Sequence, residues 1–436
     1  MNKILRGAAV LLACVVLCIA SNFLAFAIDT PDMRQNAWQG CLMLGEQQSQ
    51  PQTVGGFLSG QLDNYTAVLI LKTAGYIGGE SLPEKAVGGY RVDMPAMDGQ
   101  SSWDAYCNYE FGELAPAGSL ISYSRYWHGY TLPLRALLCV LDMANIQMIL
   151  YFVQLALMIA VLYLMNRRGL CALIPGFFLS YFLMMPFSAS ICLQYMPVSM
   201  LMLIACALIL GADERIERAV TLPVFFAALG LFTNYFDLLT FPLVSLGFPL
   251  ILLLALRMRR GECCCSLFGL TALCGVSWAL GYGLMWALKW VLTACVFGPG
   301  VLGNIFVQIG LRTSDNAGSI SRFTVLMENL NIFLAKKSYL LLIGLCGLCT
   351  LAPAARVIAQ KRSLTLDMRA AMLLLPGLAA CLWLLVTANH AHDHTYFTYR
   401  NTTVMIFSVF AFIAFVLAPK QGDCACRAAL REDHRR

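Results

Sequence analysis

The sequence predicts an all-α protein, a polytopic bundle of about ten transmembrane helices with a long first extracytoplasmic loop that carries short surface helices. Hydrophobic residues make up 59% of the 436 residues and charged residues only 12%. This leaves too little polar surface for a soluble protein of this length. Apolar runs near the ~20 residues that cross a bilayer recur along the chain, with charged residues between them. The net charge of +6 fits basic cytoplasmic loops and does not indicate nucleic-acid binding.

The first apolar run, about residues 5–28, follows Lys3 and Arg6. Two basic residues before an apolar run place the N-terminus in the cytoplasm and the next loop outside. A cleavable signal peptide is the alternative, because Ala25 to Ala27 resembles a small-residue cleavage site. The run is longer than the apolar part of most signal peptides, so an uncleaved helix is favoured. We therefore expect a first helix over residues 1–28 and an extracytoplasmic loop over residues 29–145.

The remaining chain is expected to form about nine spans over residues 146–418 and a cytoplasmic tail over residues 419–436. Arginines mark each return to the cytoplasm, as at Arg167–Arg168 and Arg257–Arg260. This pattern predicts a multi-pass protein of a cell membrane with both termini in the cytoplasm. The expected spans are approximately residues 5–28, 146–165, 170–186, 191–210, 221–236, 238–256, 266–290, 339–351, 370–387 and 403–417.

Within the long loop, two short helices are predicted to lie on the membrane surface. Asp63 occupies a good N-cap position before an apolar stretch, and residues 132–143 are apolar but interrupted by charges. Residues 78–118 are rich in Gly, Pro and Asp and are expected to be irregular. Cys41 and Cys107 would pair if the loop faces an oxidising compartment, and otherwise stay free thiols.

Acidic and basic side chains expected at the outer surface could serve a phosphate-bearing substrate. Asp29 and Asp32 follow the first helix directly. A partly desolvated carboxylate there would have a raised pKa and could accept a proton from a hydroxyl, although both could equally be plain boundary acids. Four basic residues on the same side could neutralise a phosphate, and each alone could instead be a structural or snorkelling residue. They are Arg125, Lys289, Arg312 and Arg400.

Four of the five histidines are also expected on the outer face. His390, His392 and His394 would share one side of an extended strand, which would permit a metal site, whereas on a helix they would diverge. We favour a substrate-binding role for His390 or His392, and we include His128 with them. No metal ligand or cofactor is therefore assigned, and a divalent metal stays an open alternative.

The order of these features resembles that of the GT-C membrane glycosyltransferases, which include the protein mannosyltransferases and the bacterial RgtA/B/C/D-like proteins. Residues 28–32 occupy the place of the acidic motif in the family's first loop, and residues 124–130 and 389–400 look like its polar signatures. The resemblance implies transfer of a sugar from a polyprenyl-phosphate donor to an extracytoplasmic acceptor. It also implies a first-loop Asp as general base or metal-linked acid, with Asp29 first, Asp32 second and Asp63 as a substitute.

The predicted partners are thus the polyprenyl-phosphate sugar donor and membrane lipid, while the oligomeric state stays open. A phosphate-binding Gly-rich loop, a His-Glu-x-x-His motif and a Gly-x-Ser-x-Gly motif are all absent from the sequence, which disfavours nucleotide-driven chemistry and serine hydrolysis. The main alternative function is a transporter or lipid flippase, but the charges collect at one expected surface and not along a path through the spans. A non-catalytic assembly factor and a membrane acyltransferase are further alternatives.

Overall fold

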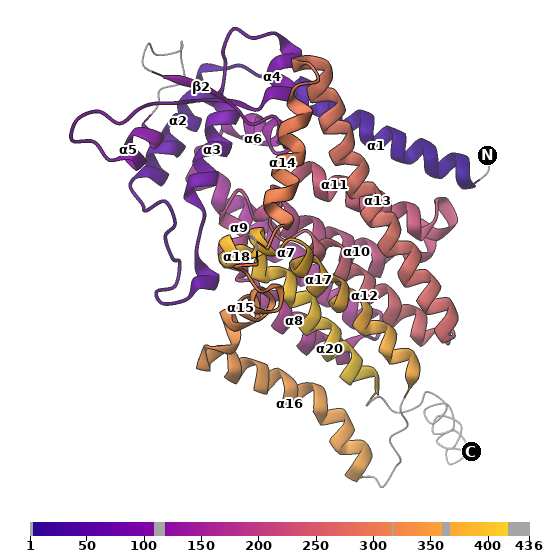
Figure 1. Ribbon diagram of the computed structural model, residues 1–436. Helices are drawn as coiled ribbons and strands as arrows, with labels where there is room; N and C mark the ends of the chain where they lie inside the picture. The colour runs from indigo at the N-terminus through magenta and orange to yellow at the C-terminus, as the bar shows by residue number, and fades with distance from the viewer. Residues whose placement is uncertain (1–2, 109–117, 316–317, 360–366, 417–436) are drawn as a thin grey trace.

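The computed structural model describes residues 3–108, 118–315, 318–359 and 367–416. The described chain is almost entirely helical and divides into a bundle of long helices and a cap, which we define as residues 26–142 (Figure 1). The cap contains α2 (Pro31–Gly45), η1 (Leu58–Gly60), α3 (Asn64–Gly75), α4 (Leu82–Gly88), β1 (Tyr90–Asp93), α5 (Ser102–Cys107), β2 (Ser119–Ser122) and α6 (Thr131–Leu138).

The bundle consists of α1 and of all the elements after the cap. α13 rises from the far end of the bundle to the cap, and α14 returns beside it (Figure 1). The elements are α1 (Lys3–Ala25), α7 (Met143–Arg167), η2 (Cys171–Leu173), α8 (Ile174–Leu183), α9 (Pro186–Ile191), α10 (Met196–Ala219), α11 (Leu222–Phe236), α12 (Leu243–Arg259), α13 (Cys264–Phe297), α14 (Val301–Thr313), α15 (Arg322–Leu334), α16 (Lys337–Ala359), η3 (Met368–Leu374), α17 (Leu375–Val386), α18 (Ala388–Asp393), α19 (Thr395–Thr398), η4 (Tyr399–Asn401) and α20 (Thr402–Val416).

Six helices in the described residues are long and apolar enough to cross a membrane, and a seventh is added if α15 and α16, bent by 82°, count as one span. The prediction of an all-α membrane protein therefore agrees with the structure, whereas about ten spans are not confirmed. Part of the difference arises at residues 170–186, where Met185 has a positive φ of 53° and Pro186 begins a new short helix. The 10 residues of α8 reach only about 15 Å, half of a bilayer core.

The two surface helices predicted in the cap are present, but the first is not on a surface. Asp63 caps α3 as expected, since its carboxylate accepts a hydrogen bond from the Thr66 amide at 3.0 Å. Ten of the twelve residues of α3 are buried, because the helix packs against α2 and α6. Its predicted position on the membrane surface was therefore wrong. The second helix, α6, ends at Leu138, and Asp142 caps α7.

The described part of the segment predicted to be irregular, residues 78–108 and 118, contains regular elements. These are α4, β1 and α5, and β1 pairs with β2 in an antiparallel ribbon with Tyr90 opposite Ser122. The prediction of an irregular segment was wrong for these elements. Cys41 and Cys107 are buried free thiols. Between the predicted spans at 266–290 and 339–351, the described residues are mostly helical, because α13 continues to Phe297 and α14 and α15 follow.

Glycines allow α11 and α13 to approach closely in the bundle. A Cβ atom at Gly230 would overlap the carbonyl oxygen of Trp278, and one at Gly281 would overlap that of Ala227. Such reciprocal contacts of small residues let two helix backbones touch. They fix the C-terminal end of α11 against the middle of α13, beside Tyr282 and below the cap.

Candidate functional site

Two of the predicted substrate-binding arginines lie in one small hollow. Arg125 follows β2, Arg312 lies near the end of α14, and both line a cavity of about 30 Å³ against α13. We call this cavity the arginine pocket. Its full lining is Arg125, Tyr126, Trp286, Trp290, Ile305, Gln308, Ile309 and Arg312.

The positive charge of the arginine pocket has no acidic partner. Arg312 donates hydrogen bonds to the Tyr126 hydroxyl at 3.1 Å and to Gln308, and the guanidinium of Arg125 lies 4.5 Å from the ring centre of Tyr123. Within the described residues neither arginine forms an ion pair with a carboxylate. The Nε atom of each is buried without a hydrogen-bond partner. Two uncompensated guanidinium groups with free donors suit a phosphate.

Asp237, in the turn between α11 and α12, is a buried acid that was not among the predicted site residues. Its Oδ1 atom accepts hydrogen bonds from the Thr240 amide at 2.8 Å and the Thr240 hydroxyl at 2.6 Å. Its Oδ2 atom has a long contact of 3.4 Å with the Tyr282 hydroxyl, and the Leu239 backbone also interacts with the carboxylate. Burial raises the pKa of Asp237 to about 6. This carboxylate thus keeps one oxygen able to accept a proton.

The backbone beside Asp237 is strained. Leu239 has a positive φ of 64°, which costs a branched L-residue on the order of 1 kcal/mol or more. The carbonyl of Leu239 accepts a hydrogen bond from His390 Nε2 at 2.7 Å. Strained residues held by neighbouring groups are frequent at functional sites. The contact therefore ties the Asp237 turn to α18.

Aromatic and amide side chains connect Asp237 with the arginine pocket. Tyr282 lies 5.1 Å from Trp278 and 6.0 Å from Trp286, measured between ring centres, and Trp286 also lines the arginine pocket. Asn234, only 2% exposed, interacts through its side chain with the Tyr282 hydroxyl. It therefore joins α11 to α13 beside Asp237.

The predicted histidines do not gather into a metal site. His390 and His392 lie on the short helix α18, so their side chains diverge as expected for a helix. His390 is buried, and burial together with Arg312 and His394 lowers its pKa to about 3. His392 is exposed and lies 2.9 Å from Glu328. The described residues contain no group of three metal-binding side chains.

The three predicted catalytic acids have different surroundings. Asp29 keeps half of its side-chain surface exposed and lies 3.6 Å from Arg34, and Asp32 is exposed in the first turn of α2. We expected both carboxylates to be partly desolvated, but the surrounding protein atoms leave both side chains exposed. Asp63 is 4% exposed, and burial raises its pKa. Both of its oxygens are engaged, by the Thr66 amide and by the hydroxyls of Thr66 and Tyr396.

Three other predicted ligands are occupied by the protein itself. Arg400 is fully buried and donates hydrogen bonds to the carbonyl groups of Met184, Tyr396 and Ser59. The Lys289 ammonium donates to the Val87 carbonyl at 2.7 Å. His128 is held by a tyrosine hydroxyl and a backbone carbonyl. Arg400 and Lys289 thus fasten the cap to the bundle through Ser59 and Val87, whereas His128 is held within the cap.

Of the four predicted basic ligands, the structure thus brings together Arg125 and Arg312, and it adds Asp237 and Asn234 nearby. The signal for Asp237 was an acid between two apolar runs, but its burial depends on residues far along the chain. Comparison with models of protein families, with curated proteins and with solved structures gave no match. Function must therefore be inferred from the site alone. A pocket with two unpaired cations and a buried carboxylate, linked through Trp286 and Tyr282, together suit proton abstraction beside a bound phosphate.

Proposed function

We propose that this protein is a membrane glycosyltransferase that moves a sugar from a polyprenyl-phosphate donor to an acceptor outside the cytoplasm. The observation that carries the proposal is the pair Arg125 and Arg312, which have no carboxylate partner within the described residues and share a pocket with Trp286. Trp286 packs against Tyr282, whose hydroxyl contacts the buried acid Asp237. A nucleotide is not needed, because the lipid phosphate is itself the leaving group.

In the proposed reaction, Arg125 and Arg312 bind the donor phosphate. The acceptor hydroxyl attacks the anomeric carbon of the sugar, and Oδ2 of Asp237 takes the hydroxyl proton. The bond between the sugar and the phosphate oxygen breaks, and its electron pair leaves with the phosphate. The guanidinium groups stabilise that developing charge. Trp278, Trp286 and Tyr282 offer aromatic faces against which the apolar face of a sugar ring can pack.

We assign the base to Asp237 in preference to Asp29, Asp32 and Asp63. A general base at neutral pH works best with a pKa raised toward the working pH, and burial has this effect on Asp237. Asp29 and Asp32 are exposed, and Asp63 is engaged as a helix cap. The first-loop acids thus remain candidates only through the resemblance to the GT-C family.

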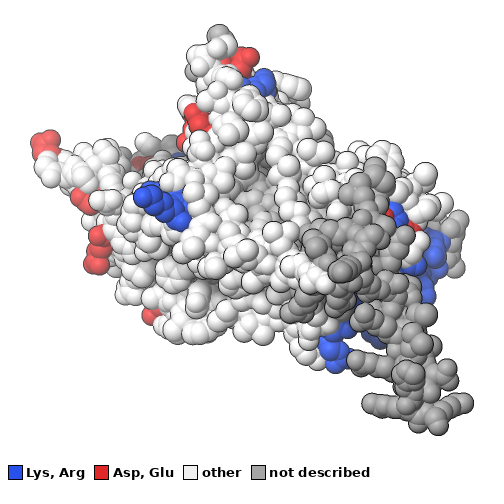
Figure 2. Space-filling model, turned by 90° about the horizontal axis from the view of Figure 1, so that it is seen from below, with Lys and Arg blue, Asp and Glu red and all other residues white. Residues whose placement is uncertain are grey.

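The distribution of charge supports an orientation with the cap outside the cytoplasm. Most Lys and Arg side chains visible in Figure 2 gather at one end of the molecule, whereas acidic side chains predominate at the other end. Arg168 and Arg260, at the ends of α7 and α12, both pair with the fully buried Asp213 at 2.6 Å. Basic residues mark the cytoplasmic side of membrane proteins.

The test is sugar transfer in reconstituted vesicles, using a panel of radiolabelled polyprenyl-phosphate sugars. We expect Asp237→Asn to lower transfer by on the order of 100-fold, the contribution typical of a general base. Arg125→Gln and Arg312→Gln should each raise the KM for the donor. Asp29→Asn is the matched control and should transfer normally. Loss of transfer in Asp29→Asn with full activity in Asp237→Asn would reverse the assignment, and donor movement across the bilayer without transfer would indicate a flippase.

A further inference from the structure

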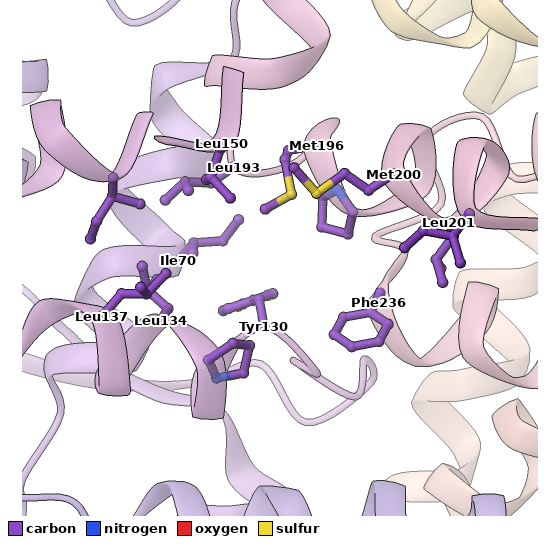
Figure 3. Close-up of a pocket in the computed structure, with 14 residues that line it drawn as sticks. Ile70, Tyr130, Leu134, Leu137, Leu150, Leu193, Met196, Met200, Leu201 and Phe236 are labelled. Atoms are coloured by element: carbon purple, nitrogen blue, oxygen red, sulfur yellow. The ribbon is translucent and has the colours of Figure 1, made fainter. Parts of the chain in front are cut away.

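A second cavity, larger than the arginine pocket and lined by apolar side chains, lies between the cap and the bundle (Figure 3). Its volume is about 290 Å³. We call it the apolar cavity. It is lined by Ile70, Tyr130, Pro133, Leu134, Leu137, Ile146, Leu150, Leu193, Met196, Pro197, Met200, Leu201, Ile204 and Phe236.

The lining of the apolar cavity excludes a charged ligand. None of its residues is charged, and the single side-chain oxygen, on Tyr130, is already bonded to His128. In Figure 3 the side chains of Ile70, Met200 and Phe236 border the open space from separate elements. Desolvating a polar group there without a partner would be costly, whereas a hydrocarbon chain would gain from burial.

The apolar cavity is continuous with the surface that faces lipid. Its walls include α7 and α10, which are both long and apolar enough to span a membrane. Ile204, at its edge, is 41% exposed, and Leu208 and Phe152 on the same two helices are exposed to a similar or greater degree. A lipid chain could therefore enter sideways from the bilayer without crossing water.

One residue that lines the apolar cavity is the chain neighbour of the proposed catalytic acid. Phe236 lines the apolar cavity, and the next residue is Asp237. The arginine pocket is formed by α13, α14 and the segment at Arg125, and the two hollows share no lining residue and no helix. A molecule whose chain fills the apolar cavity can thus present its head group to Asp237 while the donor phosphate occupies the arginine pocket.

We infer that the apolar cavity binds the hydrocarbon chain of a lipid-anchored acceptor, so that the sugar is transferred to a hydroxyl-bearing amphiphile in the membrane. This inference takes the identity of the acceptor from the proposed function. The position of the binding site comes from the apolar cavity, whose lining includes Phe236, the neighbour of Asp237. The occupant is a specific amphiphile with a hydroxylated head, and not the bulk phospholipid of the bilayer.

Photolabelling of the full chain in nanodiscs tests the location. The probe is dodecyl glucoside with a diazirine in its chain, and a diazirine phosphatidylcholine is the comparison. We expect the glucoside to label peptides of α6 and α7 at the cavity in excess over α16, whose exposed Leu341 and Leu348 report general lipid contact. Equal enrichment of the cavity peptides with the phosphatidylcholine probe would show that ordinary bilayer lipid occupies the cavity, and it would overturn the inference.

Filling the cavity provides the matched variant. Met200→Trp should reduce cavity labelling by about tenfold, because the indole occupies the space for several methylene groups. Leu208→Trp, an exposed position on the same helix, should change nothing. Leu137→Trp fills the cavity from α6 and replaces Met200→Trp if that variant fails to fold. Labelling that persists in the filled variant contradicts the inference.

Kinetics separates this inference from the proposed function. With a reactive donor, Met200→Trp should raise the KM for the alkyl glucoside acceptor and leave the KM for the donor unchanged. Specific labelling without any sugar transfer would preserve the chain site and refute the glycosyltransferase. Transfer to the alkyl glucoside with unaltered kinetics in Met200→Trp would refute the chain site alone.

Discussion

Burial of Asp237 connects the stability of the protein with its proposed chemistry. The pKa of this acid is raised from 3.8 to about 6. A raised pKa in the folded state means that folding favours the protonated acid. This stabilisation is fully present below the unfolded pKa and is lost as the pH rises through about 6. At pH 7 the folded protein therefore holds a buried carboxylate at a cost of roughly 3 kcal/mol, from about two pKa units.

Asp237→Asn should accordingly be more stable than the native chain at pH 7, by up to roughly 3 kcal/mol, while losing transfer activity. The amide oxygen can still accept the two hydrogen bonds from Thr240. We expect a higher Tm in detergent at pH 7 and a shrinking difference toward pH 4, measured by thermal unfolding at both pH values. The exposed Asp29→Asn is the control and should leave the Tm unchanged. A lower Tm for Asp237→Asn at pH 7 would contradict the proposed cost of ionisation.

Among the elements, the close pair α11 and α13 positions the site. Gly230→Ala should place a methyl group against the Trp278 carbonyl. This carbonyl belongs to the backbone of α13, so it cannot move away as the end of a flexible side chain could. We expect a loss of about 1–3 kcal/mol, the usual range for overpacking, together with reduced transfer. Thermal unfolding checks the first effect. Gly283 lies on α13, the helix that Gly230 contacts, and a Cβ atom at Gly283 would meet no atom within 4 Å. The control variant Gly283→Ala should therefore be neutral or slightly stabilising. Equal Tm values for the two variants would disprove this role of the glycine contact.

Local features of these elements could be predicted from the sequence, and their burial could not. Asp63 before an apolar stretch correctly predicted the start of α3. The same stretch was placed on a membrane surface, because a short apolar helix after a polar cap is typical of that position. In the fold Lys72 is 1% exposed and bonds to Asp93 at 2.9 Å, a partner that the local pattern does not reveal. Sequence reasoning could not predict that Lys72 is buried, because its ion-pair partner Asp93 lies outside the helix.

The same limit applies to the candidate site. Arg125 and Arg312 were predicted to bind phosphate, but only the packing of α14 beside the segment after β2 brings them into one pocket. Arg400 carries the same charge and is occupied by three carbonyl groups. Composition alone cannot separate a free guanidinium from one that holds the fold together.

At the scale of the whole molecule, the cap and the basic end lie apart (Figures 1 and 2). The arginine pocket and Asp237 lie beside the cap, and the paired arginines at the ends of α7 and α12 lie at the basic end. Basic residues remain in the cytoplasm because their transfer across a membrane is unfavourable. We therefore propose that this chemistry occurs outside the cytoplasm, with a polyprenyl-phosphate sugar as donor and no nucleotide.

This orientation predicts which loops an antibody can reach. A short epitope inserted after Gly56, in an exposed turn of the cap, should be accessible in intact cells stripped of any outer barrier. The same epitope after Gly261, in the exposed turn between α12 and α13, should bind antibody only after permeabilisation. Both glycines meet no neighbouring atom at the Cβ position, so the insertions should be tolerated equally. The reverse accessibility would place the cap in the cytoplasm, and the arginine pocket would then need a donor on that side of the membrane.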